Sequence, residues 1–78
     1  MIRQENKLII TFHTTAEAIA MEEACKARCA QGRLIPVPRS ITAGCGLAWC
    51  APPQSEEALC ALMTQCGIRP QAVQQCMI

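Results

Sequence analysis

The sequence predicts an α+β protein with the ferredoxin-like split βαβ fold (β-α-β-β-α-β), in which one antiparallel sheet carries both helices on a single face. The main observation is the order of the local patterns, which is strand, helix, strand, strand, helix, strand. Both helical segments also repeat apolar residues at helical spacing along one side. The chain has 78 residues, so we expect one domain, 1–78, with a thin core.

Residues 7–12 form a short run rich in β-branched side chains, which predicts a strand in the middle of the sheet. Thr14 followed by Glu17 is the signature of a capping box, in which hydroxyl and carboxylate satisfy free backbone amides. We therefore expect a helix over residues 15–30. Gly32 is expected to end it by adopting the left-handed conformation.

Residues 33–37 form a second apolar run, which predicts a strand. Pro36 and Pro38 cannot donate backbone hydrogen bonds, so this strand should lie at an edge of the sheet. A third strand is expected over residues 47–51, where the chain becomes apolar again before two consecutive prolines.

A second helix is expected to begin at Ser55 as its N-cap and to end at Gly67. Its predicted apolar face consists of Ala58, Leu59, Leu62, Met63 and Cys66. Residues 71–78 predict a weak strand at the other edge of the sheet. Because this edge is poorly protected, two copies of the chain could pair there as a homodimer.

Composition narrows the classes of partner. The net charge is +1, which gives no electrostatic reason to bind nucleic acid. No apolar run approaches the roughly 20 residues that span a bilayer, and the polar first residues lack the apolar region of a signal peptide. We therefore expect a cytoplasmic protein that binds neither nucleic acid nor membrane.

The chain contains seven cysteines, an unusually high count for its length. The number is odd, no export signal is visible, and the apolar content can support a core without disulfides, so we expect reduced thiols. Free cysteine is among the most buried residue types. Most of the seven are therefore expected to fill small spaces in the core.

The loop between the second and third strands contains the strongest candidate site. Cys45 lies between Gly44 and Gly46, and Arg39 is the only charged residue between positions 33 and 56. The glycines allow a tight turn that leaves the sulfur unshielded, and the backbone amides there could form an anion-accepting nest. With Arg39 nearby, such a nest would favour the reactive thiolate. The alternative is a hairpin turn in which Cys45 is incidental.

The remaining candidates have structural alternatives. Cys25 and Cys29 share a helix face and could be half of a zinc site, but the sequence offers no clear further ligands, so we expect core packing and no metal. Cys50 could resolve an intermediate formed on Cys45, or it could point into the core. His13, the one histidine, could be a general base near a thiol or simply a turn residue.

At this loop the sequence resembles a family of small selenium/sulfur carrier-like proteins, over roughly residues 7 to 67. The motifs that match are Ile10-Thr11-Phe12, residues 18–22, Ile35-Pro36-Val37-Pro38-Arg39, the spacer Ser40 to Gly44, and Cys45-Gly46-Leu47-Ala48. The chain departs from the family after this turn. Trp49-Cys50 stands where an apolar residue and then a basic one are common, which removes a positive charge and adds a thiol.

The resemblance implies that Cys45 is the carrier residue, accepting sulfur or selenium as a persulfide or selenopersulfide. Arg39, Ser40, Gly44 and Gly46 would surround the bound atom. The implied partners are a donor enzyme similar to a cysteine desulfurase or selenocysteine lyase, and an acceptor such as a selenophosphate synthetase. The protein would then be a carrier without turnover of its own, and thiolate transfer needs no cofactor.

Two other functions remain open on the sequence. The 38–46 loop could bind a small ligand or a protein, with Cys45 only a small turn residue, since this fold serves many binding functions. Alternatively, several of the seven cysteines could act together in metal binding or redox sensing.

Overall fold

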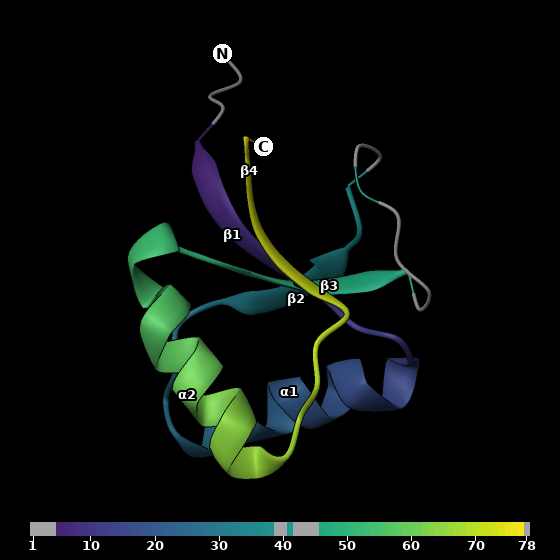
Figure 1. The fold of residues 1–78 in the computed structure, drawn as a ribbon, viewed down its shortest axis with the longest axis vertical. Helices are drawn as coiled ribbons and strands as arrows, with labels where there is room; N and C mark the ends of the chain where they lie inside the picture. The colour runs from purple at the N-terminus through teal and green to yellow at the C-terminus, as the bar shows by residue number, and fades with distance from the viewer. Residues whose placement is uncertain (1–4, 39–40, 42–45, 78) are drawn as a thin grey trace.

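The computed structural model describes residues 5–38, 41 and 46–77, and it has the predicted ferredoxin-like α+β fold (Figure 1). The sheet has four antiparallel strands in the order β2-β3-β1-β4. The elements in chain order are β1 (Asn6–Thr11), α1 (Thr15–Ala27), β2 (Arg33–Pro36), β3 (Leu47–Ala51), the 3-10 turn η1 (Pro53–Ser55), α2 (Glu56–Cys66) and β4 (Ala72–Met77).

The register explains which strands are interior. Thr11 of β1 lies opposite Ala48 of β3 on one side and opposite Ala72 of β4 on the other. On the far side of β3, Arg33 of β2 lies opposite Cys50. The predictions that β1 is central and that β2 and β4 form the edges are therefore confirmed.

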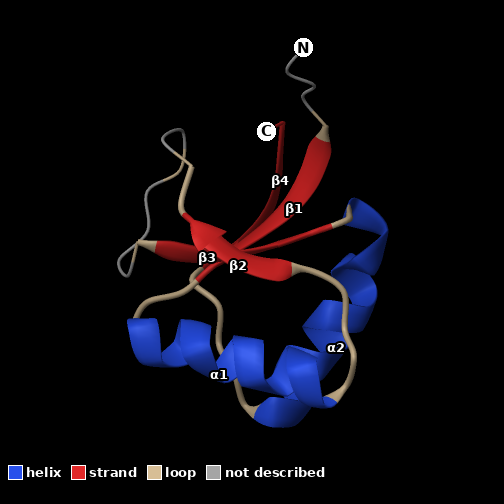
Figure 2. Cartoon of the chain, turned by 180° about the vertical axis from the view of Figure 1, so that it is seen from behind, coloured by secondary structure: helices blue, strands red, loops and turns tan. Residues whose placement is uncertain are grey.

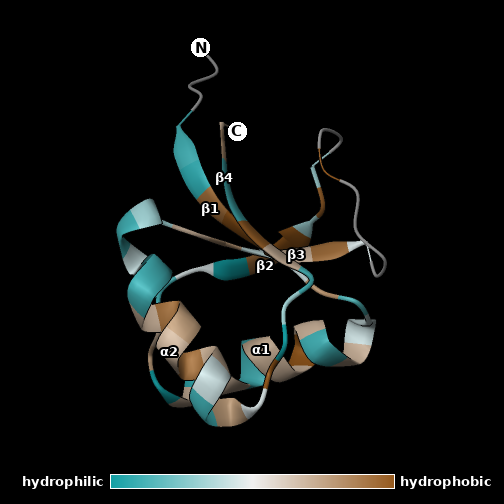
Figure 3. Cartoon of the chain, in the orientation of Figure 1, coloured by the Kyte–Doolittle hydropathy of each residue, from teal (hydrophilic) through white to brown (hydrophobic). Residues whose placement is uncertain are grey.

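Both helices cover one face of the sheet, as predicted (Figure 2). Side chains alternate between the faces of a strand, so Leu8 and Ile10 point to the same side and meet the helices there. Figure 3 shows the hydrophobic middle of β1 and β3 above helices whose surfaces alternate between hydrophobic and hydrophilic. The buried cluster is completed by Phe12, Ala18, Met21, Cys25, Trp49, Ala51, Leu59, Leu62, Met63 and Ile68.

Helix α1 begins where the capping pattern predicts. The Thr14 hydroxyl accepts a hydrogen bond from the Glu17 amide at 3.2 Å. The Glu17 carboxylate accepts from the same hydroxyl at 3.3 Å. This arrangement satisfies one of the amides that a helix start leaves without a partner, which fixes the direction in which the chain leaves β1.

The end of α1 differs from the prediction. The helix ends at Ala27, three residues early, because Cys29 adopts a left-handed backbone conformation with φ of +54°. Gly32, expected to be the left-handed cap, lies outside the helix. Leaving the helix carries Cys29 away from the apolar face, and its side chain is exposed. Core packing is thus confirmed for Cys25 and wrong for Cys29.

Helix α2 also corrects two predictions. Ser55 is at the N-cap position, but it is the last residue of the turn η1 and its side chain makes no capping hydrogen bond. Cys66, expected in the core, is exposed. The chain reverses at Gly67, whose left-handed conformation is as predicted, and the Ile68 amide then donates to the Met63 carbonyl at 2.9 Å. This turn places Ile68 over the end of the core instead of Cys66.

The face predicted for α2 is otherwise mixed. Leu59, Leu62 and Met63 are buried as expected, but Ala58 is exposed. Ala58 lies in the first turn of the helix, beside a surface cleft between α2 and the segment that follows α1. The apolar stripe that contacts the sheet is therefore narrower than the sequence suggests.

The cysteines fill the core less than expected. Six of the seven lie in the part of the chain that the structure describes, all as free thiols, and Cys25 alone among them is buried. Burial, and secondarily the neighbouring Cys66 thiol, raise the pKa of Cys25 above its ordinary value. A buried thiol with a raised pKa is a poor nucleophile, so Cys25 is a structural residue.

Candidate functional site

The predicted site loop is attached to two strands whose ends are joined by a backbone hydrogen bond. Cys45, Arg39, Ser40 and Gly44 lie outside the described residues. The amide of Val37, just after β2, donates to the carbonyl of Gly46, just before β3, at 3.0 Å. Both ends of the intervening segment are thereby held at one end of the sheet.

Gly46, the described neighbour of Cys45, has the backbone conformation that the predicted tight turn requires. Its φ is +76°, which L side chains rarely adopt, and no atom lies within 4 Å of the position a Cβ would occupy. Glycine is therefore favoured by the backbone angle and not by crowding. The residue is exposed, so the start of β3 is open to solvent.

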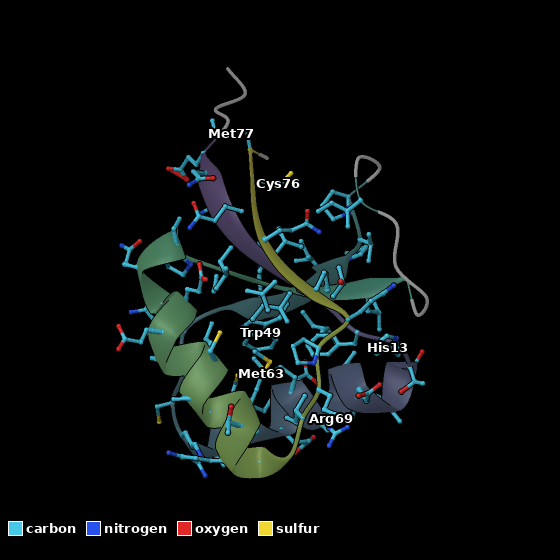
Figure 4. The ribbon with its side chains drawn as sticks, in the orientation of Figure 1. His13, Trp49, Met63, Arg69, Cys76 and Met77 are labelled. Atoms are coloured by element: carbon cyan, nitrogen blue, oxygen red, sulfur yellow. The ribbon has the colours of Figure 1, made fainter. Side chains whose placement is uncertain are left out.

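The same end of the sheet carries His13. Because Thr11 lies opposite Ala48, the chain leaves β1 towards His13 at the end where it enters β3 through Gly46. Figure 4 shows His13 between β1 and the first turn of α1. His13 is an exposed turn residue, and its role as a general base stays a prediction. His13 and Gly46 are 33 positions apart in the sequence, and the strand register is what brings both to one end of the sheet.

Cys50 lies further along β3, towards the opposite end of the sheet. It lies three positions after Leu47, or about 10 Å along an extended strand. Its side chain is half-buried and lies on the face away from the helices, because its neighbours Trp49 and Ala51 point into the core. Cys50 is thus outside the helix-facing core, and the resolving role stays a prediction.

Two cations that the sequence did not single out accompany Cys50. Lys7 and Arg33 line the same shallow hollow as Cys50, with a volume of about 320 Å³. Lys7 and Arg33 can be linked to Cys50 only when the pairing of β2 with β3 and of β3 with β1 is known. The periodicity of a single segment does not reveal which residues lie opposite on another strand.

Thr11 has a buried hydroxyl at the end of β1 that carries His13. The residue is fully buried, and Oγ1 has no hydrogen-bond partner among the residues that the structure describes. Leaving a buried polar atom unpaired is unfavourable, typically by about 1–3 kcal/mol.

We therefore predict that Thr11→Val raises the free energy of unfolding by about 1 kcal/mol, because it removes the unpaired hydroxyl and keeps the branched shape. Urea denaturation monitored by Trp49 fluorescence measures the change. Thr14→Val is the matched control, since it deletes a hydroxyl that caps α1 and should lower stability by about 1 kcal/mol. A loss of stability in Thr11→Val would mean that its hydroxyl has a partner.

A larger cleft, of about 560 Å³, lies away from the predicted loop. It separates α2 from the segment after α1, and Arg28 and Cys29 contribute to its rim. The Arg28 guanidinium donates to the Gln65 side chain across it. Within residues 5–38, 41 and 46–77, no three histidine, cysteine or carboxylate side chains are grouped so that they could hold a metal ion. Neither described helix is long and apolar enough to cross a bilayer.

Comparison with known proteins identifies the family. No curated protein and no solved structure matches the chain. The model of one family, described as "Putative Se/S carrier protein-like", matches residues 7–75, nearly the whole chain and somewhat more than the motifs alone indicated. The chain, with its ferredoxin-like fold and its glycine-flanked Cys45, belongs to this family of Se/S carrier-like proteins.

Proposed function

We propose that the protein carries sulfur or selenium on Cys45 and passes it between enzymes. The donor holds the atom as a terminal persulfide or selenopersulfide. The Cys45 thiolate attacks that terminal atom, its bond to the donor sulfur breaks, and the donor leaves as a thiolate. Cys45 then holds the persulfide, and the same step with an acceptor nucleophile returns Cys45 to its thiol form.

Family membership is the observation that carries the proposal, because the motif with Cys45 lies inside the matched residues 7–75. The structure around the loop is compatible with it. The Val37–Gly46 hydrogen bond joins the loop ends to the sheet, and rigid elements are the usual support for a reactive side chain on a loop. The N-terminus of α1 starts from the same end of the sheet, and the helix dipole favours negative charge there.

The partners follow from this chemistry. A desulfurase-like or selenocysteine lyase-like enzyme would supply the atom, and an acceptor such as a selenophosphate synthetase would take it. Transfer of this kind is nucleophilic exchange at sulfur, so the carrier itself requires no cofactor. Gly46, the described residue next to Cys45, is exposed at one end of the sheet, and a partner enzyme would approach the chain there.

We predict that reduced protein incubated with a small-molecule persulfide donor gains the mass of one sulfur atom, and that Cys45→Ser lowers this gain at least tenfold. Replacing the thiol by a weakly nucleophilic hydroxyl removes the attacking group. Intact-mass spectrometry after donor removal measures the gain. Cys29→Ser is the matched control, because Cys29 is exposed and lies just after α1, outside the loop that contains Cys45. Equal loss in both variants, or undiminished gain in Cys45→Ser, contradicts the proposal.

A further inference from the structure

A hollow on the face of the sheet away from the helices combines a thiol with two cations. It has a volume of about 320 Å³ and is open to solvent. Its lining residues are Lys7, Gly32, Arg33, Cys50, Ala51 and Pro52. These residues come from three neighbouring strands, β1, β2 and β3, and from the positions next to them in the chain.

The strand register places the cations on both sides of the thiol. Arg33 of β2 lies directly opposite Cys50. On the other side of β3, Ile9 of β1 lies opposite Cys50, and Lys7 is two residues from Ile9 on the same face. Side chains that are directly opposite on one face are about 5 Å apart at Cβ, and diagonal ones about 7–8 Å. Both cationic side chains can therefore reach a ligand bonded to the Cys50 sulfur.

The charges in the hollow are only partly compensated. Lys7 forms an ion pair with Glu5 at 3.4 Å, but the Glu5 side chain is 57% exposed, so this pair is weak. Within the described residues Arg33 makes no ion pair and no side-chain hydrogen bond, and none of the residues that line the hollow is acidic. The guanidinium is available to bind a carboxylate through two parallel hydrogen bonds.

We propose that this hollow binds small acidic disulfides and that Cys50 exchanges with them to form a mixed disulfide. Arg33 and Lys7 bind the carboxylates of the incoming molecule. The Cys50 thiol releases its proton to water, its sulfur attacks one sulfur of the disulfide, and the original S–S bond breaks. One half of the molecule stays bonded to Cys50 and the other half leaves as a thiolate, so no further oxidant is needed.

This inference does not rest on the proposed carrier function. Cys45→Ser should lower sulfur uptake at least tenfold and leave disulfide exchange at Cys50 unchanged. Cys50→Ser should abolish that exchange and leave sulfur uptake unchanged.

The test compares two disulfide reagents on the reduced full-length chain: dithiobis(nitrobenzoate), a dianion, and dithiodipyridine, which is uncharged. The rate at each cysteine is measured by quenching with an alkylating agent and quantifying peptides by mass spectrometry. At low salt the ratio of the dianion rate to the neutral rate should be roughly threefold to tenfold higher at Cys50 than at the exposed Cys66. The difference should shrink as salt is added, because salt screens the attraction.

Arg33→Gln should lower the ratio of the dianion rate to the neutral rate at Cys50 about threefold. The reaction with the dianion should become slower, and the reaction with the uncharged reagent should not change. Arg69→Gln is the matched control, since Arg69 is an exposed cation beyond the hollow, before the start of β4. The inference is overturned by equal ratios at Cys50 and Cys66, or by an unchanged ratio in Arg33→Gln. It is also overturned if that variant alters both reagents equally, because the effect would then be one of access and not of charge.

Discussion

Gly32→Ala is expected to lower the free energy of unfolding by about 2–5 kcal/mol, a large effect for an exposed residue in a loop. A Cβ at this position would lie 2.7 Å from the Cys50 carbonyl oxygen and 2.9 Å from Cε2 of Trp49, with Nε1 of the indole closer still. Gly32 also has φ of +115°, where a side chain is strained in any surroundings.

The cost arises because the atoms in the way cannot move freely. Trp49 is buried, and its indole N–H donates to the Gln31 carbonyl at 3.1 Å, so a displaced ring loses both packing and a hydrogen bond. The other obstacle is the backbone of β3 itself. Urea denaturation gives the measurement. Gly67→Ala is the control, because its φ is also positive, at +72°, but no atom lies within 4 Å of the added Cβ; it should cost only about 1 kcal/mol.

Phe12→Ala should destabilise the protein by about 3–5 kcal/mol. Phe12 is fully buried, and it lies between the end of β1 and the turn that starts α1. Domains of this size have a total stability of about 4–12 kcal/mol, so the variant should be close to unfolding at 25 °C. Phe12 belongs to one buried cluster that contains residues of the sheet and of both helices, and close-packed neighbours fill such a cavity only in part.

Ile19→Ala is the matched control for Phe12→Ala, because Ile19 is a large apolar residue of α1 that is 48% exposed. It should change stability by less than about 0.5 kcal/mol. Circular dichroism during urea denaturation distinguishes the two variants. If the costs were similar, the burial pattern described for the core would be wrong.

The fold was largely predictable from the sequence because its main signals are local. Strand β3 has the predicted bounds, 47–51, since it is an apolar run that ends at two prolines. The Thr14 cap and the Gly67 turn follow equally from short patterns. Each of these features depends on residues that are neighbours in the chain.

The predictions were wrong where tertiary contacts, and not local sequence, determine where a helix ends and which side chains are buried. Cys29 adopts a left-handed conformation that glycine would adopt more easily, and no pattern before it marks the end of α1. Cys66 continues the apolar stripe of α2, but the reversal at Gly67 brings Ile68 to the core instead. The expectation that free cysteines are buried was also wrong for Cys29 and Cys66, because both lie at helix ends, where their side chains are exposed.

For the candidate site, the structure describes one of the residues that form the expected turn. The positive φ of Gly46 is the conformation that such a turn requires, whereas the roles of Cys45, Arg39, Ser40 and Gly44 stay predictions. The positions of His13, Lys7 and Arg33 required the strand register, since His13 is far in sequence from Gly46, and Lys7 and Arg33 are far in sequence from Cys50. Periodicity along one segment contains no information about which residues lie opposite on another strand.

The most direct test of the account locates the transferred atom. The reduced full-length protein is charged by a small-molecule persulfide donor, alkylated, digested, and analysed by tandem mass spectrometry for the extra sulfur on each of the seven cysteines. The peptide with Cys45 should hold most of the added sulfur, and an acceptor thiol should remove it. Added sulfur distributed evenly over the exposed cysteines, or concentrated on Cys29 or Cys66, would contradict the carrier role of Cys45.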